Sequence, residues 1–173
     1  MIDILNIVSE PIFDDHIVKI ETHTYNPYAN TTLGYSDEIP IQHQDLYTLP
    51  CESFFYIEGK LTIRKKDELM ILGNNCVAVM FDELRYNELN GVEIDRNRNV
   101  GITCTIKNYI SLTHERSKVL HNAAWNIVAN NGGEGYFNFC VSLNKLLGFC
   151  ENYKRVVINA RHELILIRSR VVI

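Results

Sequence analysis

Alternation of apolar and polar side chains, the period of a β-strand, recurs along the chain. In residues 136–143 the alternate positions from Phe137 to Leu143 are all apolar, which predicts a strand with one buried face. The apolar run 164–167 within residues 162–168 is typical of a strand covered on both faces. Further strands are predicted at 15–25, 39–49, 53–63, 76–86 and 155–159. In the strand at 53–63, Gly59 indicates a bend or a bulge.

Helical spacing of apolar residues appears in two longer segments. The first, residues 99–112, has four apolar side chains on one helical face: Ile102, Ile106, Tyr109 and Ile110. Asn99 is placed to cap its start. The second segment, residues 113–129, begins at Thr113, whose hydroxyl is a good cap. A third, short helix is predicted over residues 143–149, between two strands.

The clearest turn in the sequence is the dipeptide Asn90-Gly91, which lies between flanks of alternating hydrophobicity. Asn-Gly tolerates the two positive φ angles of a type I′ turn, so this segment predicts a β-hairpin. Glu93 and Asp95 are two residues apart on one strand of this hairpin and are expected to share a face. Arg85 on the other strand can reach that face. We therefore predict a cross-strand ion-pair cluster that fixes the register of the hairpin.

Together these segments amount to seven or eight short strands with two or three helices in the connections. This order predicts an all-β fold, a jelly-roll β-sandwich with short helices inserted in the connections, rather than alternating βαβ units. With 173 residues, 46% of them hydrophobic and 22% charged, the chain has enough apolar material for one core. No repeat or linker-like stretch divides it, so a single domain over residues 1–173 is predicted.

Charge and candidate chemistry narrow the choice of function. A net charge of −4 argues against a dedicated nucleic-acid-binding protein. The five cysteines are odd in number and form no C-x-x-C motif, so neither a disulfide framework nor a zinc site is indicated. The six histidines are scattered, and we expect no metal, cofactor or catalytic residue. The polar triplet Arg161-His162-Glu163 is interpreted as a polar strand end rather than a site.

Three long blocks of sequence follow one another along the chain in a characteristic order. They are FDELRYNELNGVEIDR at residues 81–96, NVGIT through KNY and SLT at residues 99–113, and GYFNFCV, LLGFCENYKR and NARHELIL within residues 135–166. In order and spacing, from about residue 50 to residue 169, they resemble the major capsid proteins of Polinton/Maverick elements and adintoviruses, a double-jelly-roll family.

The resemblance implies the N-terminal jelly roll of a double jelly roll. It implies a non-catalytic subunit that self-assembles, as a trimer or ring, into a viral or virus-like shell. The partners would be copies of this chain and other capsid subunits, with no membrane, and nucleic acid only as the enclosed genome. The expected location is the virion or virus-like particle, and the cell interior during assembly. The family continues into a second jelly roll beyond the point that corresponds to Ile173.

A shell subunit needs surfaces that bind its neighbours. The strand residues Glu163, Leu164, Ile165 and Leu166, if left at the edge of a sheet, would pair with another chain, and they are the candidate assembly edge. Two other classes of function stay open at this point. One is a β-sandwich module that binds a carbohydrate or peptide, and the other is a cupin-like enzyme, which the scattered histidines disfavour.

Overall fold

The computed structural model describes residues 19–28, 36–41, 47–61, 72–88, 92–125, 135–157 and 161–169. The strands within these ranges are β1 (Ser36–Ile41), β2 (Phe54–Leu61), β3 (Phe81–Glu88), β4 (Glu93–Arg98), β5 (Gly135–Ser142) and β6 (His162–Arg168). The helices are α1 (Cys76–Val79), α2 (Val100–Ser111), α3 (His114–Lys118), α4 (Leu143–Leu146) and α5 (Gly148–Asn152), with the 3-10 turns η2 (Pro50–Glu52) and η3 (His121–Ala123).

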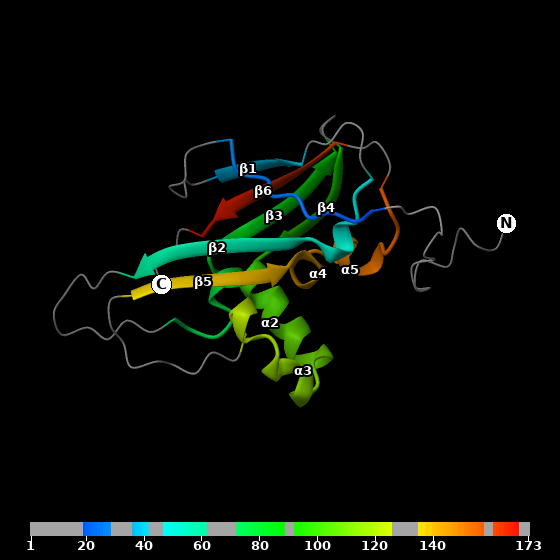
Figure 1. Cartoon of the computed structure of the whole chain (residues 1–173). Helices are drawn as coiled ribbons and strands as arrows, with labels where there is room; N and C mark the ends of the chain where they lie inside the picture. The colour runs from blue at the N-terminus through cyan, green and yellow to red at the C-terminus, as the bar shows by residue number, and fades with distance from the viewer. Residues whose placement is uncertain are drawn as a thin grey trace.

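The strands pair in a nested order (Figure 1). β1 pairs with β6, β2 with β5 and β3 with β4, all antiparallel. The first strand in sequence thus pairs with the last, the second with the last but one, and the two middle strands with each other. A further antiparallel pairing of β3 with β6 joins the outer and inner pairs into a four-stranded sheet of order β1-β6-β3-β4. β2 and β5 form a separate two-stranded sheet. Mostly antiparallel strands with this nesting and a few short helices are consistent with a jelly-roll-like fold.

Both sheets contribute side chains to one hydrophobic core. Phe55 from β2 and Val141 from β5 lie in the same buried cluster as Leu84 from β3 and Leu166 from β6. The rings of Phe55 and Phe81 meet edge to face with their centroids 5.7 Å apart, which joins the two sheets directly. This edge-to-face geometry is favourable for aromatic pairs, because the positive ring edge meets the negative ring face.

Strands β2, β5 and β6 are confirmed at the positions where strands were predicted. The alternation in residues 136–143 identified β5, and the apolar run 164–167 identified β6. β6 is buried on one face and half-buried on the other, so the expected cover on both faces is only partly met. Of the strand predicted over 39–49, residues 39–41 belong to β1, Thr48 forms an isolated bridge with Val157, and residues 42–46 lie outside the described ranges. Two strand predictions are wrong in the part of the chain that is described. Residues 19–25 form no strand, and residues 155–157 contribute only that bridge, while residues 15–18, 158 and 159 lie outside the described ranges.

The strand predicted over 76–86 is confirmed for residues 81–86, which belong to β3, and is wrong for its first part, which is the helix α1. Asn75 adopts a left-handed conformation (φ 59°) at the N-cap position of α1. Its side-chain amide donates to the hydroxyl of Thr105 at 2.8 Å, which holds the turn against α2. The expected bulge at Gly59 is absent, since the β2–β5 register runs without interruption. Instead, the ring of Phe137 lies directly over Gly59, where a Cβ atom would be 2.5 Å from it.

Of the predicted helices, α2 is confirmed, and Thr113 caps α3 by accepting a hydrogen bond from the backbone N–H of Arg116. Asn99 occupies the N-cap position of α2 with φ 50°, but its side chain makes no capping hydrogen bond. The helix predicted from Thr113 ends at Lys118, and residues 126–129 lie outside the described ranges. The helix predicted over 143–149 is split into α4 and α5 at an extended Leu147. No helix in the described ranges is long and apolar enough to cross a membrane.

The first turn of α2 packs against the backbone of α1. A Cβ atom at Gly101 would lie 2.9 Å from the Cα atom of Val79, which is closer than real Cβ contacts. Glycine at this position therefore sets how closely α1 and α2 approach. Gly73 has open space around it and provides a contrast.

We expect Gly101→Ala to lower the free energy of unfolding by roughly 1–3 kcal/mol, because relieving the overlap requires α1 and α2 to separate. Gly73→Ala, the matched control, should change it by less than about 0.5 kcal/mol. Urea unfolding followed by circular dichroism measures both. Equal stabilities of the two variants would contradict the close packing of α1 and α2.

Candidate functional site

The outer face of α2 is apolar. We define the α2 stripe as Ile102, Ile106, Tyr109 and Ile110, whose exposed fractions are 66%, 55%, 70% and 82%. The buried face of the same helix carries Val100, Cys104 and Asn108. A surface helix normally turns its apolar side to the core and its charged side to water. In α2 both sides carry apolar residues, because Val100 and Cys104 belong to the hydrophobic core while the stripe that predicted the helix faces solvent.

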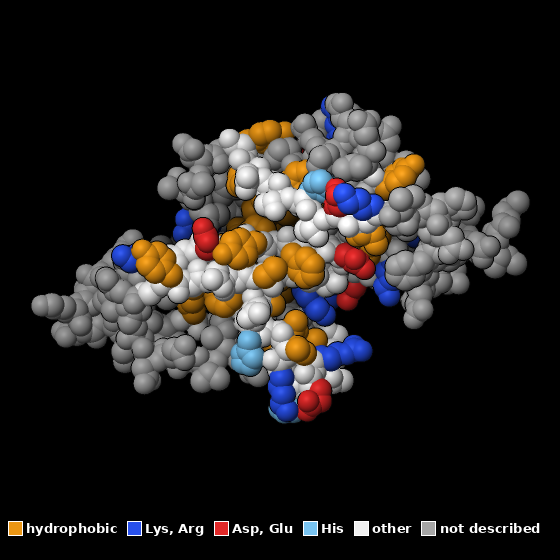
Figure 2. Space-filling model, in the orientation of Figure 1, with side chains coloured by type: hydrophobic (Ala, Val, Ile, Leu, Met, Phe, Trp, Pro, Cys, Tyr) orange, Lys and Arg blue, Asp and Glu red, His pale blue; other side chains and the backbone are white. Residues whose placement is uncertain are grey.

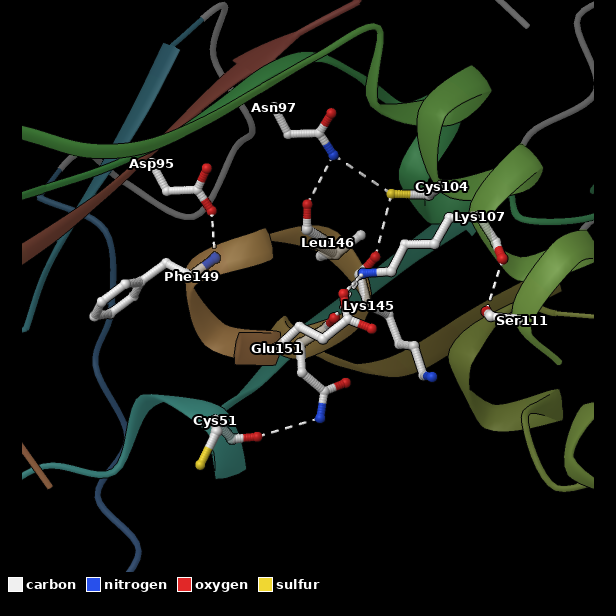
Figure 3. A network of polar contacts seen from close by, with 11 residues as sticks. Cys51, Asp95, Asn97, Cys104, Lys107, Ser111, Lys145, Leu146, Phe149 and Glu151 are labelled. Atoms are coloured by element: carbon white, nitrogen blue, oxygen red, sulfur yellow. Dashed lines mark hydrogen bonds and ion pairs between the residues drawn. The ribbon is translucent and has the colours of Figure 1, made fainter. Parts of the chain in front are cut away.

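The inward side of α2 also supplies hydrogen-bond donors to α4 (Figure 3). α4 is a single turn of four residues, so most of its carbonyl groups have no partner within the helix. Lys107 Nζ donates to the carbonyl of Asn144 at 3.1 Å, and the Cys104 thiol donates to the carbonyl of Lys145 at 3.4 Å. Lys107 is also 2.6 Å from the carboxylate of Glu151, which pairs its charge.

Strand β4 holds the junction of α4 and α5 from the other side (Figure 3). Asn97 Nδ2 donates to the carbonyl of Leu146 at 2.7 Å, which satisfies the end of α4. Asp95 Oδ2 accepts from the backbone N–H of Phe149 at 2.7 Å, which satisfies the start of α5. Three successive carbonyls of α4, those of residues 144, 145 and 146, are therefore paired with side chains of α2 and β4. We call these contacts the α4 network.

The thiols in this region are poor nucleophiles. Burial raises the pKa of the Cys104 thiol, which agrees with its role as a hydrogen-bond donor. Burial, together with the negative charge of Asp95, raises the pKa of Cys150 to about 12. Both groups are protonated at neutral pH, so they act as small buried side chains rather than reactive centres.

The predicted ion-pair cluster of the β3–β4 hairpin is centred on a residue that sequence reasoning missed, Glu83. Its carboxylate pairs with Arg85, lies 3.4 Å from Arg96 Nε and lies 3.4 Å from Arg98 Nε. Arg96 also pairs with Glu93. Arg85 and Glu93 thus both take part in the cluster, but they are linked through Glu83 and Arg96. Glu83 lies two residues before Arg85 on the same strand face, and that spacing is the signal that could have identified it.

The expectation that Glu93 and Asp95 share a face is wrong. The β3–β4 register shifts, so that Tyr86 faces Asp95 while the next residue, Asn87, faces Glu93. This irregularity places the two carboxylates on opposite faces of the sheet. Glu93 joins the outer ion pairs, and Asp95 turns inward to the α4 network. The predicted turn residues Asn90 and Gly91 lie outside the described ranges.

The candidate assembly edge is also corrected. β6, which contains Glu163, Leu164, Ile165 and Leu166, is hydrogen-bonded to β1 on one side and to β3 on the other. It is an interior strand, so its backbone is not available to another chain. His162 at its start is buried and stacks on the ring of Tyr86 with centroids 5.2 Å apart, in agreement with a polar strand end.

A second set of exposed aromatic residues lies on the outer face of β2 and β5, where Figure 2 shows a row of hydrophobic side chains. These side chains have partners of their own. The Tyr56 hydroxyl donates to the carboxylate of Glu58 at 3.0 Å, and Lys60 Nζ lies 5.7 Å from the ring centre of Tyr136. Lys60 and Tyr136 form a cross-strand pair, which is usual on the solvated face of an antiparallel sheet, whereas Tyr56 and Glu58 lie two residues apart on β2. The α2 stripe is a further candidate for a binding surface, and within it the ring of Tyr109 packs edge to face on Trp125 with centroids 5.1 Å apart.

The nested antiparallel strands and the single shared core are consistent with a jelly-roll-like protein. The model of the double jelly roll-like domain family matches residues 70–172, more than half of the chain, and the chain belongs to this family. The matched segment contains β3 to β6, α2 and the side-chain donors and acceptors of the α4 network. Domains of this family are typically structural capsid folds, so membership indicates a capsid-like structural role. No curated protein matches the chain.

We expect Asp95→Ala to lower the free energy of unfolding by about 1–2 kcal/mol, because the N–H of Phe149 loses its acceptor at a helix start. Glu93→Ala on the same strand removes an outer ion pair and should cost less than about 1 kcal/mol. Chemical denaturation of the two variants side by side measures the difference. A larger loss for Glu93→Ala than for Asp95→Ala would contradict the roles assigned here.

The ion pairs of Glu83 predict a pH dependence of stability. Burial alone would raise the pKa of Glu83, but the hydrogen bond and charge of Arg85, with the charges of Arg96 and Arg98, make the net pKa lower than usual. The cluster therefore stabilises the fold above the pKa of the unfolded chain, and this contribution is lost as the pH falls through the folded-state pKa. Glu83→Gln should be less stable than the wild type at pH 7, and the difference should shrink below about pH 5. Urea midpoints that differ by the same amount at every pH would rule out this linkage.

Proposed function

We propose that this chain is a non-catalytic, capsid-like structural subunit that self-assembles with copies of itself into a viral or virus-like shell. The observation that carries the proposal is the family match over residues 70–172, together with the nested strand pairing. The proposal extends to a β-sandwich built as a single jelly roll over residues 1–173. The edge-to-face contact of Phe55 and Phe81 between the two sheets supports that arrangement.

The closer assignment within the family is the major capsid protein of Polinton/Maverick elements and adintoviruses. The blocks 81–96, 99–113 and 135–166 that resemble those proteins all lie inside the matched segment. The proposed partners are copies of this chain and other capsid subunits, with nucleic acid present as the enclosed genome. The proposed location is the virion or virus-like particle, and the cell interior during assembly.

The surface properties of the chain support an assembly role. A shell is held together by contacts that its subunits make only after they have folded. A free subunit therefore presents apolar surface to water before assembly. The α2 stripe is such a surface, and the α4 network fixes its orientation from behind. The two sheets provide the rigid support, because both are packed on one core.

Self-assembly predicts a particle mass that rises with protein concentration. We expect light scattering after size exclusion to give discrete masses above 20.0 kDa, and negative-stain images of the same fractions to show rings, capsomers or shells. Dilution should reverse the association, which separates assembly from irreversible aggregation. A clean monomer at the highest attainable concentration and at several salt concentrations would contradict the proposal. Saturable binding of a sugar or peptide by that monomer would then support a binding module instead.

A further inference from the structure

The two-stranded sheet has a free edge along β2 (Figure 1). The backbone N–H of Leu143 donates to the carbonyl of Ser53 at 2.9 Å, so the hydrogen-bonded pairs with β5 fall on the odd-numbered residues of β2. The even-numbered residues direct their N–H and C=O groups away from β5, and they are Phe54, Tyr56, Glu58 and Lys60. In the described part of the chain, β2 pairs with no strand other than β5. Such a row of backbone groups is a template for an added strand.

The other sheet edges are less suited to an added strand. On the far side of the same sheet, η3 packs beside β5. At the two ends of the four-stranded sheet, β1 contains Pro40, which has no N–H, and β4 carries the exposed charges of Glu93, Arg96 and Arg98. Proline, charged side chains and covering loops are the usual means by which proteins protect a sheet edge from other chains. β2 contains no proline, and its charged residues are one glutamate and one lysine.

The charge pattern of β2 selects a second copy of the same strand as its partner. Glu58 and Lys60 are exposed, have opposite charges and lie two residues apart on the outer face. When two identical strands pair antiparallel about a two-fold axis at Gly59, Glu58 of each copy lies opposite Lys60 of the other. Two charges of the same sign would repel in this pairing, whereas the observed charges are complementary to themselves.

Gly59 suits the centre of this pairing. It belongs to a hydrogen-bonded pair with β5, so toward a second strand it forms a non-hydrogen-bonded pair, in which the Cα atoms approach to about 4.5 Å. A Cβ atom at this position would collide with the ring of Phe137, so the residue has no side chain to offer on that face. Glycine within a strand is frequent where another backbone approaches closely.

We propose that β2 pairs with β2 of a second copy, antiparallel and centred on Gly59, to form one continuous sheet of order β5-β2-β2-β5. Backbone hydrogen bonds at Glu58 and Lys60 join the two strands, and the two ion pairs between these residues fix the register. A two-stranded sheet gains stability when further strands are added. This inference rests on the proposed self-assembly and adds the surface, the partner strand and the register of one of its contacts.

Charge reversal at the two positions tests the register. Glu58→Lys places lysine opposite Lys60, and Lys60→Glu places glutamate opposite Glu58, so each single variant should associate roughly tenfold more weakly than the wild type. The double variant Glu58→Lys/Lys60→Glu restores opposite charges and should associate as the wild type does. An equimolar mixture of the two single variants should also recover association, because one copy then supplies both lysines and the other both glutamates. Sedimentation velocity over a concentration series measures all of these samples.

Asn138→Lys is the matched control, because Asn138 lies opposite Glu58 on β5 and is exposed on the same face, one strand away from the edge. It should associate as the wild type does. Circular dichroism and urea midpoints show that all the variants are folded, since residues 58, 60 and 138 are exposed. A double variant as weak as the single variants would overturn the inference, because Glu58 and Lys60 would then meet a different surface. An equal loss of association in Asn138→Lys would also overturn it, since a charge anywhere on this face would then suffice.

The outcomes separate this inference from the proposed function. Rings or shells that form equally well with Glu58→Lys overturn the β2 contact and leave the assembly role intact. A wild-type dimer that depends on residues 58 and 60 but never grows further supports the β2 contact and contradicts shell formation. A wild-type protein that is monomeric at every concentration overturns both.

Discussion

The donation of side-chain hydrogen bonds to three successive carbonyls of α4 is the constraint on which the rest of the structure depends. α4 is too short to pair these carbonyls internally, and the side-chain hydrogen bonds that pair them are partly buried. Asn97 from β4 and Cys104 and Lys107 from α2 supply the donors. One short helical turn therefore fixes both a strand and a twelve-residue helix relative to the core.

The orientation of α2 is linked to this constraint. Lys107 and Cys104 face α4, and on the opposite side of the helix the α2 stripe is exposed to solvent. A subunit with a disrupted α4 network would lose the orientation of α2 as well as stability.

The four-stranded sheet also shows that residues close together in sequence can serve different parts of the fold. The register shift in the β3–β4 hairpin sends Glu93 outward to the arginines and Asp95 inward to the start of α5. One carboxylate stabilises the hairpin on its solvent side, and the other stabilises a helix that follows more than fifty residues later. The nested pairing of β1 with β6 and of β2 with β5 similarly joins segments from the two ends of the chain. The folding of this domain therefore depends on contacts that are distant in sequence.

The sequence by itself determined the elements whose signals are local: the strands β2, β5 and β6, the antiparallel β3–β4 pairing, the helix α2, and the cap at Thr113. It also carried the blocks that resemble a double-jelly-roll family, to which the chain belongs. Only the tertiary structure decided that β6 is an interior strand, that residues 76–79 form a helix, that Asp95 serves α5 and that the stripe of α2 faces outward. Periodicity reveals which residues share a face, but the partner of that face is set by segments far away along the chain.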